Sequence, residues 1–382
     1  MKKEISNRQK DCGEPALLQM LLPLFPWYLK NARPLPWRED IDPYRVWLSE
    51  IMLQQTRIEA VRPYYARFLA EAPSIASLAA LPDERLMKLW EGLGYYSRAR
   101  NLKKAAAIIV EQYGGEMPQN YDEIRALPGI GDYTAGAISS IVYGLPYPAV
   151  DGNVLRVLAR LTNDGADITT PDTKKRMTEA LREVYLALDK TDFTTHGCPE
   201  TKKKPASLLT QALMELGQTL CLPNRLPICE ECPLSPLCRA REAETTDRIP
   251  YRSKKKERRV EDRLVLLLCD TEGNFAINRR PAEGLLAGLW ELPNILVEEN
   301  ADAYAAISQF CTANGIRPTE FAELPAARHL FTHIEWRMRG FYINVEKTAN
   351  SPLTFVTEED LFANRAIPSA FRAYMPYIRK KI

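Results

Sequence analysis

The stretch that most constrains the fold is Leu127–Asn153, with the sequence LPGIGDYTAGAISSIVYGLPYPAVDGN. A helix cannot continue through its Pro-Gly-x-Gly turn, because proline lacks an amide proton and glycine favours positive φ angles. We expect Asp132 to cap a new helix that begins near Tyr133. A glycine-rich turn that opens a helix presents backbone N–H groups, which suit a phosphate. Candidate phosphate contacts are therefore Gly129 and Gly131.

A second aspartate, Asp151, stands at another predicted helix start, just before Asn153–Arg160. A backbone that contacts phosphate close to a placed carboxylate suggests chemistry on a nucleic acid. The net charge of the chain is only +2, so an affinity for nucleic acid must come from local patches. At 382 residues the chain exceeds the usual size of a single domain, which predicts two domains.

The sequence predicts neither a secretion signal nor a membrane span. Residues 1–10 are charged and no apolar segment follows them, so we expect no signal peptide. The longest uncharged run, 133–150, contains two glycines and two prolines, which favours a buried helix and loop over a membrane span. Eight cysteines are too sparse for a disulfide scaffold in a chain of this length. We expect a cytoplasmic, nucleoid-associated protein that does not bind membranes.

A helix is predicted over 44–56, because Asp42 is a good N-cap and Pro43 suits the first helical position. Its apolar residues cover a surface wide enough to be largely buried, and Glu50 lies inside that surface. A glutamate in such a helix ordinarily points to solvent. If Glu50 instead faces a cleft, desolvation raises its pKa and makes it a candidate general acid. Both alternatives stay open at this stage.

The segment Gly92–Tyr96 (GLGYY) interrupts the helical pattern and is expected to expose an apolar, aromatic tip. Basic groups that follow this tip can contact phosphates, while apolar side chains can insert between base steps. The alternative is an ordinary connecting loop beside a solvated basic face. The basic residues in question are Arg98, Arg100, Lys103 and Lys104.

Four cysteines cluster with the spacing C-x7-C-x2-C-x5-C, namely Cys221, Cys229, Cys232 and Cys238. This clustering indicates a metal centre rather than disulfides. Zinc sites of four cysteines usually contain two close pairs, whereas only one pair is close here. The unequal gaps favour a [4Fe–4S] cluster, which also takes four thiolates.

The composition changes after the cysteines. Eight basic and three acidic residues fall within 248–263, which predicts an exposed linker. We place the linker at 246–262, a helical catalytic domain at 1–245 and a smaller α/β domain at 263–382. The elements expected in the α/β domain are strands over 264–269 and 275–278, a helix over 301–313, and short strands around 331–334 and 337–345.

Taken together, these residues resemble the helix-hairpin-helix DNA glycosylases, and closely the adenine-specific mismatch glycosylases of the MutY type. The resemblance runs from about Pro34 to the C-terminus. Its markers are LPWR at 35–38, WLSEIMLQQT at 47–56, LWEGLGYYSRARNL at 89–102, the stretch 127–153, the cysteine cluster, and GLLAGLWELP at 284–293. It implies a multidomain protein, with an all-α helix-hairpin-helix domain that holds an iron–sulfur cluster and a C-terminal α/β Nudix-like domain.

The resemblance assigns roles to the candidate catalytic residues. It implies that Glu50 protonates adenine and later activates water, while Asp151 stays ionised and stabilises the oxocarbenium-like sugar, with Asn153 orienting the site. Two carboxylates with different pKa values suit these two tasks. Bifunctional relatives of the endonuclease III type carry a lysine where this chain has Tyr133. Tyrosine cannot form a Schiff base, so we expect a monofunctional enzyme that leaves the DNA strand intact.

The resemblance also implies the substrate, duplex DNA with adenine opposite 8-oxoguanine or guanine, bound by a monomer. The adenine must flip out of the duplex, which Leu93 and Tyr95 would support by wedging. The Nudix-like domain is expected to sense 8-oxoguanine, and it lacks the REx2Ex2G pattern that binds magnesium in Nudix hydrolases. The implied lesion-reading loop is Phe331, Thr332 and His333. Candidate contacts near the mispair are Gln55 and Thr56, and those of the adenine pocket are Leu35, Arg38 and Gln211.

The sequence departs from the family pattern in three places: the first cysteine gap is x7 instead of x6, Thr332 replaces a serine, and 191–204 looks inserted. Three rival interpretations remain. The first is a thymine- or pyrimidine-specific glycosylase of the endonuclease III type on the same scaffold. The second is a DNA-binding iron–sulfur protein without catalytic activity. The third, a nucleotide pyrophosphohydrolase, is disfavoured by the missing magnesium-binding pattern.

Overall fold

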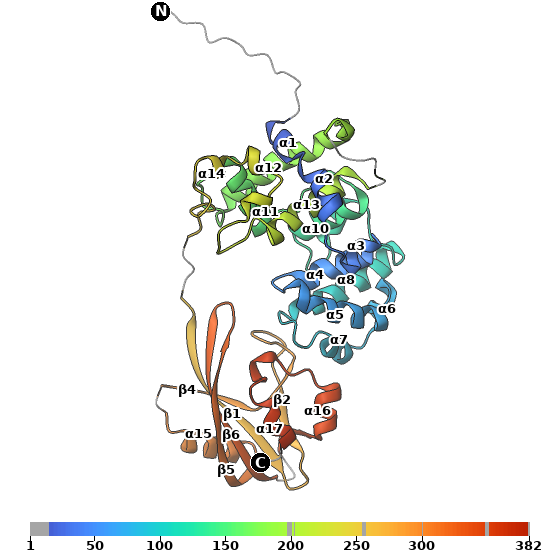
Figure 1. Cartoon of the computed structure of the whole chain (residues 1–382). Helices are drawn as coiled ribbons and strands as arrows, with labels where there is room; N and C mark the ends of the chain where they lie inside the picture. Colours follow the sequence, from blue (N-terminus) through green and yellow to red (C-terminus); the bar gives the residue numbers. More distant parts are fainter. Residues whose placement is uncertain are drawn as a thin grey trace, which may run out of the picture. The chain divides into compact units, whose positions relative to one another are not determined.

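The computed structural model describes residues 15–196, 201, 203–253, 257–299, 301–347 and 351–380 (Figure 1). These residues form two compact units. The first contains the residues up to Gln55 and those between Ala105 and Lys254; the second contains Thr56–Lys104 and the residues after Lys254. The two units cut across the predicted domains, because the helices of Thr56–Lys104 belong with the C-terminal sheet. The domain boundaries at 245 and 263 stay a prediction.

The first unit is helical. Its core lies between α11 and α13, against α1, α2 and α12, where the buried side chains are mostly leucine and valine. α4 packs against α10 and against the π-helical turn Ser139–Tyr143 that extends α10. The helices are α1 (Ala16–Leu21), α2 (Leu24–Asn31), α3 (Pro36–Glu39), α4 (Pro43–Leu53), α9 (Tyr121–Ala126), α10 (Asp132–Ile138), α11 (Gly152–Thr162), α12 (Pro171–Ala187), α13 (Pro205–Thr219) and α14 (Arg239–Glu242).

The second unit combines short helices with a mixed sheet. Its helices from the first half of the chain are α5 (Ile58–Glu71), α6 (Ile75–Ala80), α7 (Asp83–Leu89) and the beginning of α8 (Ser97–Tyr113), which continues into the first unit. The sheet has the strand order β3-β2-β1-β6-β5, with β4 paired to β1 and β7 to β2. Its strands are β1 (Arg259–Asp270), β2 (Phe275–Arg279), β3 (Trp290–Glu291), β4 (Asn294–Val297), β5 (Ile316–Leu330), β6 (Ile334–Lys347) and β7 (Thr354–Val356).

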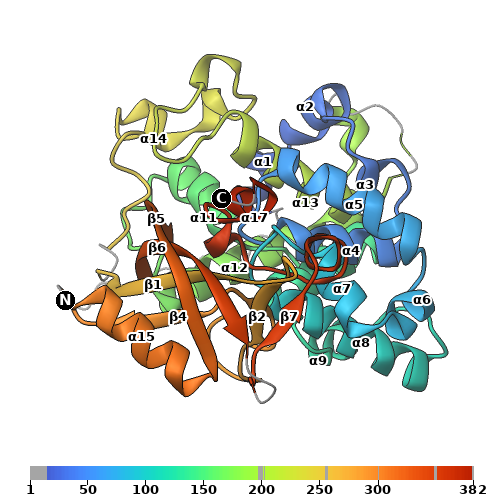
Figure 2. The ribbon, with the colours of Figure 1, turned by 90° about the horizontal axis from the view of Figure 1, so that it is seen from below.

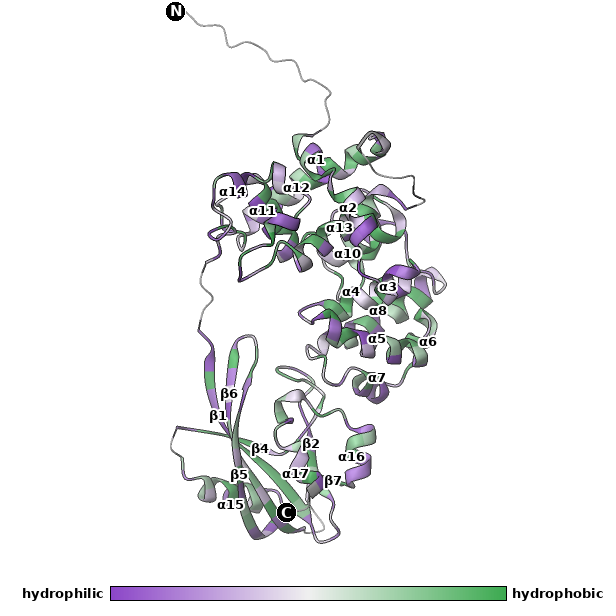
Figure 3. Ribbon diagram, in the orientation of Figure 1, coloured by the Kyte–Doolittle hydropathy of each residue, from purple (hydrophilic) through white to green (hydrophobic). Residues whose placement is uncertain are grey.

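Both faces of the sheet are covered. β1 pairs with β6 in parallel, so alternate residues of these two central strands enter different cores. Leu264, Leu266 and Leu268 pack beneath α15 (Ala303–Ala313), whereas Val265 and Leu267 face a core that includes residues of α16 (Glu358–Asn364) and α17 (Met375–Lys380). Figure 2 shows α15 lying along one face, and Figure 3 shows β1 turning from polar at its start to apolar at its centre.

Four sequence-based predictions of local structure were wrong. The helix over 44–56 ends at Leu53, because Gln55 adopts a positive φ of 57°. Asp132 is the first residue of α10 rather than its cap, and its carboxylate pairs with Arg125 at 2.5 Å. Residues 259–262, for which no strand was expected, already belong to β1. The strand expected at 331–334 is the turn of a long β5–β6 hairpin.

Candidate active site

Glu50 faces the interior of the first unit and not solvent. Its exposed fraction is only 6%. The hydroxyl of Tyr133, on α10, donates a hydrogen bond to its carboxylate. Burial is the main cause that raises the pKa of Glu50 to about 7; the charge of Asp151 raises it further, while the Tyr133 hydroxyl and the charge of Arg38 oppose the shift. Of the two alternatives left by the sequence, the buried one is therefore correct.

Asp151 is held by the start of α11, as the sequence predicted. Its Oδ1 accepts hydrogen bonds from the backbone N–H groups of Asn153, at 2.8 Å, and of Val154, at 2.9 Å. Its Oδ2 accepts a third from the Asn153 side-chain amide at 2.7 Å. Arg156 in turn donates to the amide oxygen of Asn153 at 3.0 Å, which orients that amide. The carboxylate thus has a fixed position, and its charge acts on Glu50.

A second buried glutamate, Glu215 on α13, organises the neighbourhood of Arg38. It has 0% exposure, and its two oxygens accept from Arg33 at 2.5 and 3.1 Å and from Arg38 at 2.7 Å. Burial alone would raise the pKa of Glu215, but the hydrogen bonds and charges of the two arginines hold it below the usual value. Arg38 is thereby fixed close enough to Glu50 for its charge to affect that carboxyl.

The other predicted members of the adenine pocket lie beside this ion pair. Gln211 accepts a hydrogen bond from Tyr28 at 3.0 Å, and the Arg38 guanidinium lies 5.7 Å from the centre of the Tyr28 ring. Leu35 caps the start of α3 with 2% exposure. Sequence reasoning missed Tyr28, Arg33 and Glu215. The sequence did carry a signal for Glu215, since it is the one charged residue of α13, the apolar helix that precedes the cysteines.

The hairpin leading to Tyr133 has the predicted shape. Gly129 has a φ of +78°, which strains any other residue, and Gly131 precedes α10 with open space where a side chain would begin. Gly136 is required for another reason. A Cβ there would lie 2.4 Å from the carbonyl oxygen of Pro148, so α10 and the loop before Asp151 approach closely.

In the second unit, the loop Gly92–Tyr96 only partly matches its prediction. Tyr95 is 45% exposed with a positive φ of 46°, but Leu93 is buried at 6%. Arg98 is also buried and donates to the carbonyl groups of Leu93 at 3.0 Å and Gly94 at 3.1 Å, so it supports this loop instead of forming a basic surface. It further donates to Thr56 at 3.4 Å.

The turn Phe331–His333 lies at the tip of the β5–β6 hairpin and meets that loop within the second unit. The hydroxyl groups of Thr332 and Tyr95 are hydrogen-bonded at 3.0 Å. Phe331 packs edge-on against Trp336, with ring centres 4.9 Å apart. The structure therefore brings Tyr95 and Thr332 together, although 237 positions separate them in the sequence. Gln55 is exposed at the end of the first unit.

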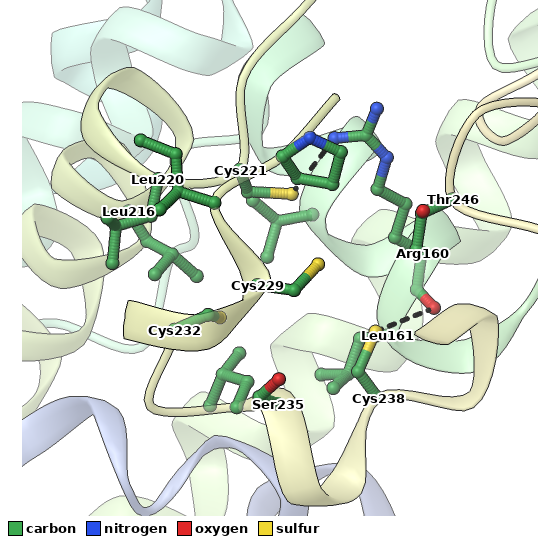
Figure 4. Close-up of a pocket in the computed structure, with 14 residues that line it drawn as sticks. Arg160, Leu161, Leu216, Leu220, Cys221, Cys229, Cys232, Ser235, Cys238 and Thr246 are labelled. Carbon is green, nitrogen blue, oxygen red and sulfur yellow. Dashed lines mark hydrogen bonds between the residues drawn. The ribbon is translucent and has the colours of Figure 1, made fainter. Parts of the chain in front are cut away.

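The four clustered cysteines line one small cavity beside α11 and α13, which is partly open to solvent (Figure 4). Arg160 on α11 donates to the Cys221 sulfur at 3.4 Å, and its own carbonyl oxygen lies 3.4 Å from the Cys238 sulfur. In the described part of the chain, no three His, Cys, Asp or Glu side chains are arranged to hold a single ion. Four thiols around a shared space, with a guanidinium nearby, fit a negatively charged thiolate cluster. Cys198 lies outside the described residues, as do the other residues of 197–200 and residue 202.

Family models match both parts of the chain. The model described as HhH-GPD superfamily base excision DNA repair protein matches residues 48–184, and the model described as NUDIX domain matches residues 264–376. Both predicted halves of the architecture are thereby confirmed. Among the described helices, none has both the length and the apolar character that crossing a membrane requires.

Similar proteins cover most of the chain. Adenine DNA glycosylase of Homo sapiens is 31% identical over 92% of this chain and 73% of its own length. Adenine DNA glycosylase of Arabidopsis thaliana is 33% identical over 90% of this chain and 59% of its own. Among solved structures, a thermostable thymine-DNA glycosylase is 26% identical with a TM-score of 0.48, covering 59% of this chain and 95% of its own.

Proposed function

The chain belongs to the adenine DNA glycosylases of the HhH-GPD superfamily, and from this premise we propose how its residues remove adenine from duplex DNA. The observation that carries the proposal is the buried Glu50, whose pKa of about 7 keeps it protonated in a useful fraction of molecules near neutral pH. Adenine is a poor leaving group unless a ring nitrogen is protonated. Glu50 donates that proton, and its carboxylate then activates the water that attacks the sugar.

Asp151 and Asn153 stabilise the positive charge that develops on the sugar when the bond to adenine breaks. The carboxylate of Asp151 is pre-positioned by its three hydrogen bonds, so it needs little reorganisation during the reaction. The adenine itself lies against Leu35, Arg38 and Gln211. The ion pair with Glu215 fixes the guanidinium of Arg38, which makes it a directional hydrogen-bond donor.

Tyr133 makes the enzyme monofunctional in this proposal. Its hydroxyl is engaged with Glu50, and burial together with the charges of Glu50 and Asp151 raises its pKa well above the usual value. A neutral phenol neither attacks the sugar nor forms an imine. We therefore expect no DNA adduct to be trapped by borohydride at catalytic levels; efficient trapping would contradict this role.

The base opposite adenine is read mainly by residues of the second unit. We propose that Phe331, Thr332 and His333, together with Tyr95, Thr56 and Leu93, contact a mispair of adenine with 8-oxoguanine or guanine. Gln55, the last residue of the N-terminal segment of the first unit, is proposed as a further contact. The hydrogen bond between Tyr95 and Thr332 supports this, because it joins the two predicted contact sites in one body. The backbone at Gly129 and Gly131 remains the proposed phosphate contact, and a monomer remains the proposed state.

The cysteines Cys221, Cys229, Cys232 and Cys238 would hold a [4Fe–4S] cluster, whose thiolate bonds would cross-link the segment 221–238 beside α11 and α13. The chemical test is iron and sulfide content in the anaerobically purified protein. Four iron atoms per chain are expected, and Cys232→Ser is expected to lower that number, whereas Cys311→Ser, on helix α15 of the second unit, leaves it unchanged. Stoichiometric zinc instead of iron would contradict the assignment.

The activity test incubates the protein with duplexes that contain adenine opposite 8-oxoguanine, guanine or cytosine, and one that contains a T:G mispair. Alkali then cleaves any abasic site. We expect cleavage at the adenine opposite 8-oxoguanine first, then opposite guanine, and none at thymine. Cleavage at thymine, or none at adenine in duplexes that the protein binds, would contradict the proposal.

A further inference from the structure

Three charged side chains flank the loop Gly92–Tyr96, two before it and one after it. They contact the backbone of the C-terminal elements, all within the second unit. Lys88 lies at the end of α7 and Glu91 just after it, before the loop. Arg100 lies in the first turns of α8, after the loop. The mechanism proposed above uses none of the three. α7 also packs beside α16, which places these side chains near the chain that leads to α17.

The contacts are specific hydrogen bonds. The Glu91 carboxylate accepts the backbone N–H of Ile367 at 2.8 Å, and the Lys88 ammonium donates to the backbone carbonyl of Arg365 at 3.0 Å. Lys88 and Glu91 are themselves paired at 2.7 Å, so one ion pair serves both backbone groups. Their side chains are only 15% and 29% exposed, and Ile367 is buried in the core of the sheet.

A third backbone contact lies on the other side of the loop. Arg100 donates to the carbonyl of Ala287 at 2.9 Å, in the segment between β2 and β3. The tip of the loop makes the fourth connection, through Tyr95 and Thr332 at 3.0 Å. The loop is therefore attached before, at and after its tip to connecting segments of the C-terminal half of the second unit.

We propose that Lys88, Glu91 and Arg100 are positioning residues that set the register of the loop Gly92–Tyr96 against the turn Phe331–His333. The inference rests on the proposed reading of the opposite base by that turn. A hydrogen bond between single hydroxyl groups, such as that of Tyr95 with Thr332, is too weak to fix two loops by itself. Hydrogen bonds between charged side chains and buried backbone groups are stronger and directional, so they hold the register. Precise register matters for distinguishing 8-oxoguanine from guanine, which differ by a single oxygen and one N–H.

The test compares single-turnover rates of adenine release opposite 8-oxoguanine and opposite guanine. Glu91→Leu removes the acceptor for Ile367 and is expected to lower the ratio of the two rates about tenfold, the effect of one charged hydrogen bond. Glu91→Gln keeps an oxygen that accepts the same N–H, so it is expected to restore a ratio close to that of the wild type. Glu71→Gln is the matched control, because Glu71 on α5 is 30% exposed and pairs with Arg85 on α7, so both partners lie within Thr56–Lys104.

The outcomes separate two failures. If the wild-type protein does not prefer 8-oxoguanine, the proposed reading of the opposite base fails, and the positioning role fails with it. If the wild type shows the preference but Glu91→Leu keeps the same ratio, or slows both substrates equally, only the positioning role is overturned. Should Glu91→Leu fold poorly, Lys88→Met removes the neighbouring contact with Arg365 and is expected to lower the same ratio, and an unchanged ratio there would also overturn the role.

Discussion

Two glutamates in the first unit have nearly the same sequence setting and opposite electrostatic states. Glu50 lies in WLSEIML on α4, and Glu215 lies in ALMELGQ on α13. Both are buried, with 6% and 0% exposure. Glu50 is hydrogen-bonded to a neutral tyrosine, and its pKa rises to about 7, whereas Glu215 is bonded to two arginines, and its pKa falls below the usual value.

Burial alone is therefore not enough to make a carboxyl group a candidate general acid. Desolvation raises the pKa of both carboxyls, and the neighbours decide the outcome. The arginines keep Glu215 ionised, and it fixes Arg38 by charge, which suits the proposed binding role. Among the described residues no cation forms an ion pair with Glu50, and its pKa of about 7 suits the proposed role as an acid. Four predictions test whether the two glutamates differ in this way.

Glu50→Gln should have the largest effect on activity. Losing the proton donor is expected to slow adenine release about a thousandfold, within the range for general acids. Binding to the mispaired duplex should persist, because the amide has the same shape. Single-turnover cleavage and a binding titration measure the two quantities, with the exposed Glu111→Gln on α8 as control. Activity within tenfold of the wild type would remove Glu50 from its role.

Glu215→Gln should have the largest effect on folding. Removing one partner of a buried ion pair leaves the two arginines without their countercharge, which is expected to cost about 3–5 kcal/mol of unfolding free energy. Denaturant unfolding measures this cost. Because Arg38 also loses its support, adenine release should slow while the pH dependence of the rate keeps its shape. A variant as stable as the wild type would show that the ion pair contributes little.

Glu50→Gln should also stabilise the protein at high pH. A folded-state pKa of about 7, against an ordinary 4.5, means that wild-type stability falls as pH rises from 4.5 to 7. Glutamine cannot ionise, so the variant is expected to gain on the order of 3 kcal/mol over the wild type at pH 8 and much less at pH 4.5. Thermal unfolding at both pH values tests this. An equal difference at the two values would contradict the raised pKa.

The smallest effect concerns how the rate of adenine release by the wild-type enzyme depends on pH. Only protonated Glu50 donates to adenine, so the single-turnover rate should be level below about pH 7 and then fall about tenfold per pH unit. Glu215→Gln should show the same midpoint, since that side chain does not supply the proton. A rate that rises through pH 7 would point to a base, and not an acid, as the group that titrates.

The sequence contained enough to predict several of these features and not others. The caps at Asp42 and Asp151 follow from local chemistry, and the structure confirms both. Strand β5 was missed because its residues are mostly exposed and show no apolar alternation. Without β5, the turn Phe331–His333 looked like a strand.

Contacts between residues far apart in the sequence could not be predicted either. Arg33 and Glu215 are 182 positions apart, and no local pattern indicates that they meet. The burial of Glu50 could not be decided from its helix alone, since the apolar surface of α4 allowed either orientation. Leu93 was expected at an exposed tip, but it is buried. The buried Arg98 side chain donates a hydrogen bond to the carbonyl group of Leu93.

Both carboxylate oxygens of Asp151 accept hydrogen bonds at the start of α11. Asp151 is therefore under a different evolutionary constraint from Glu50. Substitutions at 151 remove a helix cap as well as a charge, so selection for a folded protein and selection for repair both act on that residue. If Glu50 is the proposed acid, its replacement by glutamine is opposed by repair alone, because a neutral amide of the same shape removes the cost of a buried charge. In a survey of single variants, Asp151→Ala should then be depleted in measurements of protein abundance, and Glu50→Gln only in measurements of mutation rate.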